Sequence, residues 1–355
     1  MSNPTLLRDA SVAYHLQLIQ PWLAAPDVQE ICVNRPAELW CERKGQWERH
    51  AVEGLSLAHL HGLAKAVARY NDRDVSFETP LLAGNLPQGE RIQIVVPPAC
   101  EQGRLSLTVR KPAATRWGLP ELAAQGMFDA AASRHETDEA LRRLYARQDV
   151  PGFLRLAVRL GKVIVVAGQT GAGKTTLMNA LAAEIPAGER IVTIEDVREI
   201  RLDDHPNHVH LLHGTAAGRT LPVSELVRAA LRMSPSRLLL SELRGAEAFD
   251  FLRACSSGHQ GGLTTCHADS AASAFDRLAL MCLQHPDSRG LRYPVIRRLL
   301  DSVIDVVVHL DRGPGNRRHM TDIWFGGRLR SGARGRARPG RRPAASGWPR
   351  WPGRS

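Results

Sequence analysis

A glycine-rich segment near the middle of the chain has the residue types and the spacing of a phosphate-binding loop. Residues 168–175 read GQTGAGKT and match the pattern GxxxxGK[ST]. The apolar run Val163–Ala167 precedes this segment, and a helix-forming stretch follows it. In that arrangement, loop amides and the positive end of a helix dipole face the same anion. A glycine-rich turn that matches by chance is the alternative, but the two flanks favour a nucleotide site.

The spacing within the loop assigns a role to each kind of residue. Gly171 and Gly173 allow the backbone to turn its N–H groups inward, toward phosphate oxygens. Lys174 can reach the β- and γ-phosphates, and the Thr175 hydroxyl is suited to Mg²⁺. The predicted nucleotide-binding residues in and beside the loop are Gly168, Gln169, Thr170, Gly171, Ala172, Gly173, Lys174, Thr175 and Thr176. The loop alone does not distinguish an ATPase from a GTPase or a kinase, although no guanine-reading NKxD motif is present.

Two acidic side chains stand at the ends of predicted strands. The run IVTIEDVREI at 191–200 places Glu195 at a strand end, and RLLLSELR at 237–244 places Glu242 just after a strand. Ligands of parallel sheets bind at the carboxyl ends of the strands. A carboxylate there can hold Mg²⁺ through water or orient the attacking water, and such acid–base help is worth ~10²–10⁴ in rate. Acids that cap the following helices are the alternative, but two of them beside a phosphate loop favour catalysis.

Histidines supply a third candidate element. The run GHQGGLTTCHA at 258–268 places His267 at the carboxyl end of a predicted strand, where it can donate to a γ-phosphate and respond to its loss. The alternative is that His267 has only a structural role.

A second group of histidines, which has the spacing of metal ligands, consists of His205, His208, His210 and His213. The strand expected over 209–213 separates His210 from His213, so a metal site is not expected there.

The order of predicted elements divides the chain into four segments. Residues 1–112 read as a mixed α/β amino-terminal domain, and 113–150 as a linker with some helical content. Residues 151–325 alternate strands and helices, which predicts an α/β domain with a parallel sheet. Residues 326–355 consist almost entirely of Gly, Pro, Arg, Ala and Ser, and we expect them to be disordered. Their abrupt join to the preceding strand is also what an out-of-frame extension would produce.

The individual elements follow from the periodicity of apolar residues. Predicted helices cover Tyr14–Leu23, Leu57–Tyr70, Trp117–Phe128, Glu136–Arg147, Phe153–Leu160, Thr175–Glu184, Val223–Met233, Glu247–Cys255 and Ala271–Leu283. Predicted strands cover Glu30–Val33, Glu38–Trp47 (a pair folded at Lys44-Gly45), Arg91–Val96, Leu105–Arg110, Val163–Ala167, Arg190–Ile194, Val209–His213, Arg237–Leu240, Leu263–Cys266 and Met320–Phe325.

The net charge of +11 is concentrated in the predicted tail. Residues 326–355 hold nine arginines and no acid, which leaves +2 for residues 1–325. The body of the protein is therefore not expected to bind nucleic acid through a basic surface.

No run of apolar residues approaches the ~18 that a membrane span needs, and Met1–Ala10 do not have the pattern of a signal peptide. The six cysteines include no CxxC pair and read as reduced thiols of a cytosolic protein.

Four motifs in this order resemble those of the secretion-superfamily ATPases. They are a Walker A loop (168–175), an acidic box (TIEDVREI, 193–200), a Walker B-like strand (RLLLSELRGAEA, 237–248) and a histidine box (GHQGGLTTCHADS, 258–270). The resemblance extends over about residues 11–325. In the amino-terminal half it rests on EICVNRP (30–36), GERIQIVVPP (89–98) and SLTVRKP (106–112). The chain is most similar to the hexameric traffic ATPase of type IV secretion systems, since a long extra amino-terminal region and a four-cysteine zinc element are absent.

The resemblance implies a RecA-like P-loop domain preceded by a smaller mixed α/β domain, with ATP and Mg²⁺ bound between the two. It implies that Arg91 and Arg110 reach the nucleotide phosphates, although solvated strand-edge arginines are the alternative from the residues alone. It also implies that Glu242 acts at the hydrolytic water with Glu195 nearby, and that His267 senses the γ-phosphate. Ser241 departs from the magnesium-directing acid of many P-loop ATPases, which makes direct coordination of Mg²⁺ by this strand doubtful.

The function implied is that of a motor which hydrolyses ATP to ADP and phosphate and powers substrate transfer or pilus biogenesis. The expected assembly is a cytoplasmic homohexamer, peripheral at the inner membrane, with membrane components of a type IV secretion system and a second secretion ATPase as partners. Three alternatives are a conjugation or pilus motor, a nucleotide-binding scaffold with little turnover, and nucleic-acid binding through the arginine tail.

Overall fold

The computed structural model describes residues 4–112, 118–124, 126–128, 133–213, 215–216 and 219–326. Contacts group the chain into two compact units, each made of two segments. The first unit comprises Met1–Gln125 and Pro186–Ser241, and the second comprises Gly126–Ile185 and Glu242–Ser355. The predicted division at residues 112, 150 and 325 is not tested by this grouping and stays a prediction. The predicted disordered tail, apart from Gly326, lies outside the described residues.

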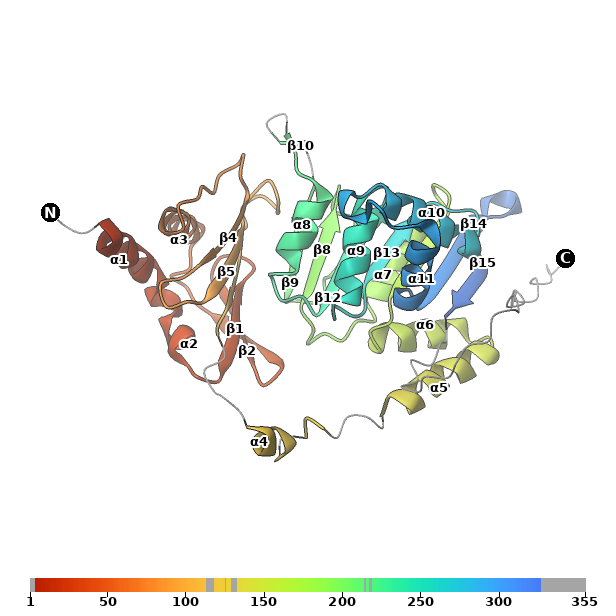
Figure 1. Ribbon diagram of the computed structural model, residues 1–355, viewed down its shortest axis with the longest axis horizontal. Helices are drawn as coiled ribbons and strands as arrows, with labels where there is room; N and C mark the ends of the chain where they lie inside the picture. Colours follow the sequence, from red (N-terminus) through yellow and green to blue (C-terminus); the bar gives the residue numbers. More distant parts are fainter. Residues whose placement is uncertain are drawn as a thin grey trace. The chain divides into compact units, whose positions relative to one another are not determined.

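An antiparallel sheet of six strands lies in the first unit, in the order β3-β2-β1-β6-β5-β4 (Figure 1). Its strands are β1 (Val28–Val33), β2 (Glu38–Arg43), β3 (Gln46–Ala51), β4 (Leu81–Asn85), β5 (Arg91–Val95) and β6 (Ser106–Arg110). The helices of this region are α1 (Pro4–Leu16), η1 (Gln17–Ile19), α2 (Gln20–Ala24), α3 (Leu57–Tyr70) and α4 (Leu119–Ala124). Helix α3 begins at the Ser56 cap, which accepts from the His59 N–H, and it buries Leu60, Leu63 and Val67 in the core beside the sheet.

The first unit also contains three parallel strands, with β8 between β12 and β9. Their bounds, with those of the neighbouring elements, are β8 (Ile191–Glu195), β9 (His208–Leu212), β10 (Thr215–Ala216), β11 (Arg219–Thr220), α8 (Val223–Ala230) and β12 (Arg237–Leu243). The apolar residues of β8 and of the first half of β12 are buried, as is typical of strands covered on both faces.

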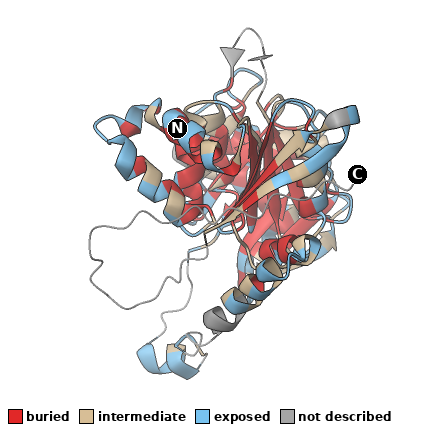
Figure 2. Cartoon of the chain, turned by 90° about the vertical axis from the view of Figure 1, so that its right-hand side faces the viewer, coloured by how far each residue is buried: buried red, intermediate tan, exposed pale blue. Residues whose placement is uncertain are grey.

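In the second unit, β7 lies between two parallel neighbours, β13 and β14, and β15 runs antiparallel to β14. The strands are β7 (Ile164–Gly168), β13 (Leu263–Cys266), β14 (Val306–Arg312) and β15 (Arg318–Phe325). The helices are α5 (Ser133–Ala146), α6 (Val150–Arg159), α7 (Lys174–Ala182), α9 (Glu247–Ser256), α10 (Ala271–Leu283), η2 (Pro286–Ser288), α11 (Tyr293–Val303) and η3 (Pro314–Asn316). Figure 2 shows buried residues on the strands and exposed residues on the outer faces of the helices. None of the helices in the described ranges combines the length and apolar character that crossing a bilayer requires.

The α/β fold class is confirmed, and most predicted elements are present. The ranges predicted for α3, β13 and α10 match the structure residue for residue. The single predicted helix Tyr14–Leu23 is wrong, because Pro21 opens α2 and η1 separates this helix from α1. The predicted strand Arg237–Leu240 is too short, so Glu242 lies within β12 and not after it. Strands β4 and β14 and helix α11 were not among the predicted elements.

One buried cation joins the six-stranded sheet to the parallel strands within the first unit. Arg190 is fully buried, and its Nη1 donates to the Asn34 Oδ1 at 2.7 Å and the Asn207 Oδ1 at 2.6 Å. Its Nε donates to the Met233 carbonyl oxygen at 2.8 Å, and its Nη2 donates to the Thr108 hydroxyl at 3.3 Å. Because a buried charge is tolerated only when it is well hydrogen-bonded, these neutral acceptors fix the position of the guanidinium.

Replacing this guanidinium is expected to destabilise the first unit. The Arg190→Ala variant leaves a cavity and several buried acceptors without a donor, so we expect a loss of about 2–5 kcal/mol in the free energy of unfolding. Urea denaturation followed by circular dichroism measures this loss. Arg159→Ala removes an exposed arginine that pairs with Glu184 and serves as the control, with an expected change below about 1 kcal/mol. Equal stabilities of the two variants would contradict the interpretation.

Candidate active site

The predicted phosphate loop connects β7 directly to α7. Strand β7 ends at Gly168, and α7 begins at Lys174 with Gly173 as its N-cap. Gly171 and Gly173 have φ values of 74° and 99°, which favour glycine over residues with a side chain. The loop therefore has the left-handed turns that a phosphate cradle requires, and it ends at a helix N-terminus.

Lys174 lies across this loop and contacts a predicted catalytic residue. Its Nζ donates to the carbonyl oxygens of Gly168 at 2.9 Å and Gln169 at 3.2 Å. The same Nζ is 3.5 Å from the Nδ1 of His267. Partial burial lowers the pKa of Lys174, and the nearby Glu242 carboxylate opposes that shift. Lys174 is thus held among loop carbonyls and beside the two side chains predicted for catalysis.

His267 and Glu242 form the second half of this cluster. The His267 Nε2 is 2.8 Å from the Glu242 Oε1, and the Arg244 Nε donates to the Glu242 Oε2 at 2.7 Å. The Glu242 side chain is largely buried, whereas His267 is partly exposed. His267 follows β13, whose Cys266 pairs in register with Ala167 of β7, so the two strands end at the same level. The structure therefore brings together Lys174, His267 and Glu242, three residues that the sequence predicted separately.

An arginine pair beside the loop was missed by the sequence analysis. Arg312 and Arg318 face each other across β14 and β15. The Arg312 Nε donates to the Gly171 carbonyl oxygen at 2.9 Å, and the Arg318 side chain packs so close to Gly173 that a Cβ there would lie 3.1 Å from it. No motif marks these arginines, and only the register of a strand that was not predicted places them at the loop.

Glu195, the other predicted catalytic acid, lies at the end of β8 in the first unit and is fully buried. Its Oε1 accepts from the Thr193 hydroxyl at 2.5 Å and is 2.8 Å from the His210 Nδ1. Its Oε2 accepts from the N–H groups of Glu199 and Ile200, each at 2.8 Å. Burial acts to raise the pKa of Glu195, but these hydrogen bonds outweigh it and lower the pKa overall. Side chains of β8 and β9 thus engage Oε1, and the segment that follows β8 engages Oε2.

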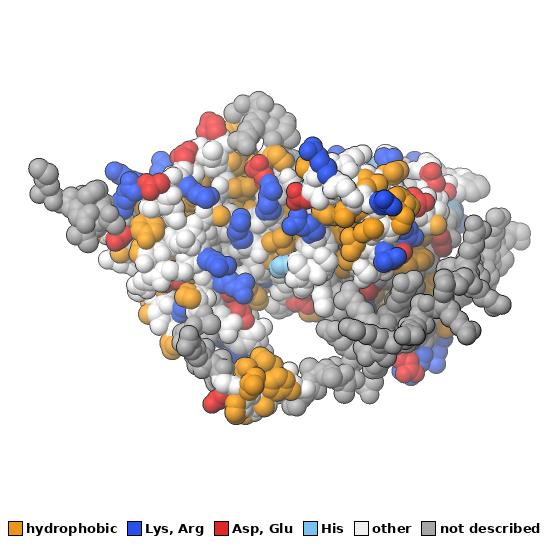
Figure 3. Space-filling view, in the orientation of Figure 1, with side chains coloured by type: hydrophobic (Ala, Val, Ile, Leu, Met, Phe, Trp, Pro, Cys, Tyr) orange, Lys and Arg blue, Asp and Glu red, His pale blue; other side chains and the backbone are white. Residues whose placement is uncertain are grey.

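Arg91 and Arg110 lie opposite each other on β5 and β6 of the first unit. They line a cavity of about 520 Å³ together with Arg73 and Arg232. Like charges placed directly opposite each other on a sheet repel, so such a group is well suited to an anion. On the face drawn in Figure 3, basic side chains are interspersed with acidic and apolar ones.

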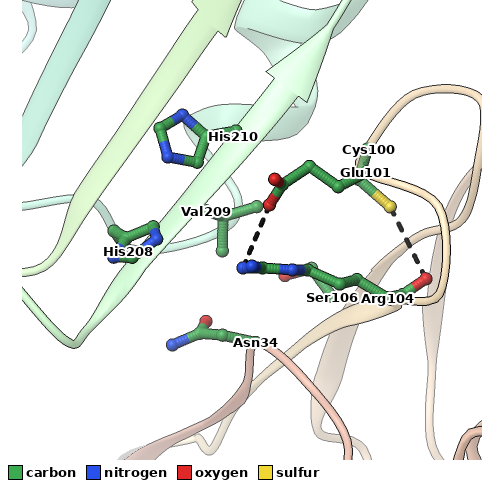
Figure 4. A pocket seen from close by; sticks show the side chains of 8 residues that line it. All are labelled: Asn34, Cys100, Glu101, Arg104, Ser106, His208, Val209 and His210. Atoms are coloured by element: carbon green, nitrogen blue, oxygen red, sulfur yellow. Dashed lines mark hydrogen bonds and ion pairs between the residues drawn. The ribbon is translucent and has the colours of Figure 1, made fainter. Parts of the chain in front are cut away.

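Two of the histidines at 205–213, His208 and His210, pack against each other within the first unit. His208 and His210 line a cavity of about 10 Å³ beside Asn34 and Cys100 (Figure 4), and their rings meet edge to face at 5.0 Å. Burial lowers the pKa of His208 to about 4, so this ring is neutral at neutral pH. The Nδ1 of His208 lies 2.5 Å from the His205 carbonyl oxygen.

The side chains at the start of α7 are compatible with a magnesium ion. Thr175, in the first turn of α7, is exposed, and hydroxyl and phosphate oxygens are ligands that Mg²⁺ prefers. The Glu242 Oε1 is buried and accepts no well-directed hydrogen bond, although the His267 ring lies beside it. The Thr175 hydroxyl and the Glu242 carboxylate are oxygen donors of the kind that such an ion prefers.

Comparisons with known proteins agree with this arrangement. Residues 13–324 match the family model described as type II/IV secretion system protein. The chain is 58% identical over 328 residues to the type IV secretion system protein PtlH of Bordetella pertussis, covering 90% of this chain and 96% of that protein. It is 49% identical over 328 residues to the type IV secretion system protein VirB11 of Brucella suis, covering 90% of this chain and 91% of that protein.

A solved structure extends the likeness to the fold. A crystal structure of the VirB11 ATPase from the Brucella suis type IV secretion system, in complex with sulphate, matches with a TM-score of 0.85. The match covers 90% of this chain and 96% of that chain, at 49% sequence identity. The motifs, the geometry of the loop and these matches lead to one conclusion: the chain belongs to the family of type II/IV secretion system proteins.

Proposed function

We propose that the chain hydrolyses ATP to ADP and phosphate and acts as the motor of a type IV secretion system, powering substrate transfer or pilus biogenesis. The observation that carries this proposal is the contact of Lys174 with His267, and of His267 with Glu242, beside the phosphate loop. A loop that only held a nucleotide would not require this cluster. The similarity to the VirB11 ATPase of Brucella suis supports the same activity.

The cluster suggests how water attack at the γ-phosphate would be assisted. The His267 Nε2 faces the Glu242 carboxylate and its Nδ1 faces the Lys174 ammonium group, so the ring lies between the two charged side chains. Lys174 then stabilises charge on the phosphates, and Glu242 orients the attacking water. Arg244 balances the charge of Glu242 and fixes one of its oxygens. His267 connects Lys174 with Glu242 and is therefore placed to transmit the loss of the γ-phosphate.

Magnesium fits beside Thr175, where it would neutralise charge on the β- and γ-phosphates. The chain's own part is to position that ion through the Thr175 hydroxyl and, through water, the Glu242 carboxylate. Ser241 stands before Glu242, so β12 has no second acid at this point.

For Glu195 we propose a positioning role. Because its carboxylate accepts hydrogen bonds from the N–H groups of Glu199 and Ile200, it fixes the backbone of the segment that follows β8.

For Arg91 and Arg110 we propose contact with nucleotide phosphates from the amino-terminal domain. Four arginines line their cavity and Glu30 pairs with Arg110 at 3.6 Å, which leaves a positive excess that supports contact with an anion.

The proposed assembly is a homohexamer that associates peripherally with the inner membrane through partner proteins of the secretion system, including a second secretion ATPase. A conjugation motor of the same superfamily is the second candidate, and neighbouring genes for a relaxase or pilins would favour it. The similarity to named type IV secretion proteins supports the first candidate.

The assembly is tested by measuring particle mass and ATP turnover together, for the full chain and for residues 1–325. We expect hexamers with turnover in both samples, because the residues that carry the resemblance end before the tail. Monomers that retain full turnover would contradict the hexamer. A 1–325 fragment that does not assemble would show that the tail takes part in the ring.

Lys174→Ala is expected to abolish phosphate release while the fold survives. The ammonium group contacts two loop carbonyls, and its loss removes charge stabilisation at the β- and γ-phosphates. A malachite-green phosphate assay measures turnover, and circular dichroism monitors folding. The control is Lys162→Ala, since Lys162 pairs with Asp138 away from the loop. Turnover at the wild-type rate in Lys174→Ala would remove the loop from the mechanism.

Glu242→Gln is expected to reduce turnover by about 10²–10⁴-fold and to preserve ATP binding. The amide keeps the size of the side chain but loses the negative charge that orients water. Turnover and binding of a fluorescent ATP analogue are measured on the same samples. Glu184→Gln, which changes a surface ion pair of the same unit, is the matched control. Unchanged phosphate release in Glu242→Gln would favour a nucleotide-binding scaffold over an enzyme.

A further inference from the structure

A hairpin of the amino-terminal sheet brings together three side chains that are typical metal ligands. Cys41 of β2 pairs in register with Glu48 of β3, and His50 lies two residues further along β3. Since side chains two residues apart on a strand share a face, all three project from the same side of the hairpin. In the described residues, this is the one group of three or more such side chains with ligand atoms within 4.8 Å of one another.

The separations between the ligand atoms match those around a tetrahedral zinc ion. The Cys41 Sγ is 3.4 Å from the His50 Nε2 and 3.9 Å from the Glu48 Oε2, and the last two atoms are 3.7 Å apart. Zinc bonds of about 2.0–2.3 Å place tetrahedral ligands roughly 3.3–3.7 Å from one another. An ion could therefore bind with shifts of only a few tenths of an ångström.

The surroundings hold two of these ligands in place and leave an entry path. Cys41 is fully buried at the border of the hydrophobic core, which fixes its sulfur atom. The Trp22 ring packs against the His50 ring, with centroids 5.2 Å apart. The side chains of His50 and Glu48 are 31% and 44% exposed, so an ion can reach the group from solvent.

One neighbouring charge must be accommodated. Arg43 pairs with the Glu48 Oε2 at 2.8 Å, and it also pairs with Asp27 at 3.2 Å. Asp27 therefore balances the guanidinium when Glu48 turns toward an ion. The combination of a thiolate and an imidazole selects zinc over the magnesium that accompanies nucleotides, because Mg²⁺ prefers oxygen ligands.

We propose that Cys41, Glu48 and His50 form a zinc-binding site that cross-links β2 and β3. Three protein ligands leave the fourth position to water. The ion would tie the outermost strand of the six-stranded sheet to its neighbour, and it would stabilise the folded chain because the unfolded chain has no preformed site. The site is independent of the proposed ATPase activity.

The test uses the full chain, stripped of metal under reducing conditions. We expect about one zinc ion per chain by isothermal titration, a thiolate-to-cobalt charge-transfer band when Co²⁺ replaces zinc, and a higher melting temperature with zinc. Cys41→Ala and His50→Gln should each lose the tight binding and the band. His50→Gln changes a partly exposed residue, so it decides the question if Cys41→Ala does not fold.

The matched control is Cys32→Ala, which removes another buried thiol of the same sheet. Cys32 lies on β1, contacts the Thr108 hydroxyl, and is outside the cluster. This variant should bind zinc and cobalt as the wild type does. Absence of binding by the wild type, survival of the cobalt band in His50→Gln, or loss of the band only in Cys32→Ala would overturn the proposal.

Discussion

The site depends on the register between two parallel strands. β7 and β13 pair so that Ala167 lies opposite Cys266, and each strand is followed at once by a functional segment. The phosphate loop leaves β7 at the same edge where His267 leaves β13. Lys174 can therefore contact the loop carbonyls and the imidazole together, and Glu242 completes the group from β12. A slip of one residue would turn every side chain of a strand to the opposite face and separate these groups.

The same constraint explains why much of the site could be predicted from the sequence. In a parallel α/β sheet, functional side chains lie at the carboxyl ends of strands. The run before Gly168 is short and continuously apolar, and the short run Leu263–Cys266 before His267 follows two glycines. Regular amphipathic helices such as α3 were predictable for a related reason, since their apolar spacing and their serine cap agree. In these elements, the local sequence pattern and the tertiary contacts favour the same structure.

Other features depend on contacts that no local pattern reveals. Arg312 reaches Gly171 only through the pairing of β14 with β7 and β15, and β14 was not predicted. Glu195 looked like a free acid at a strand end, but His210, fifteen residues later, and two backbone N–H groups engage its oxygens. Long-range partners of this kind depend on strand pairing, which single-sequence periodicity does not determine.

Arg190 has a consequence for the order in which the chain acquires its structure during synthesis. Asn34 and Thr108 leave the ribosome long before Arg190, whose guanidinium donates to them, because they precede it by 156 and 82 positions. Until residues 186–241 have emerged, the six-stranded sheet has an unfinished surface where polar groups face water. Contacts this distant in sequence slow folding, because a long loop must close before they form. The amino-terminal sheet therefore acquires these hydrogen bonds only after residues 186–241 have been synthesised.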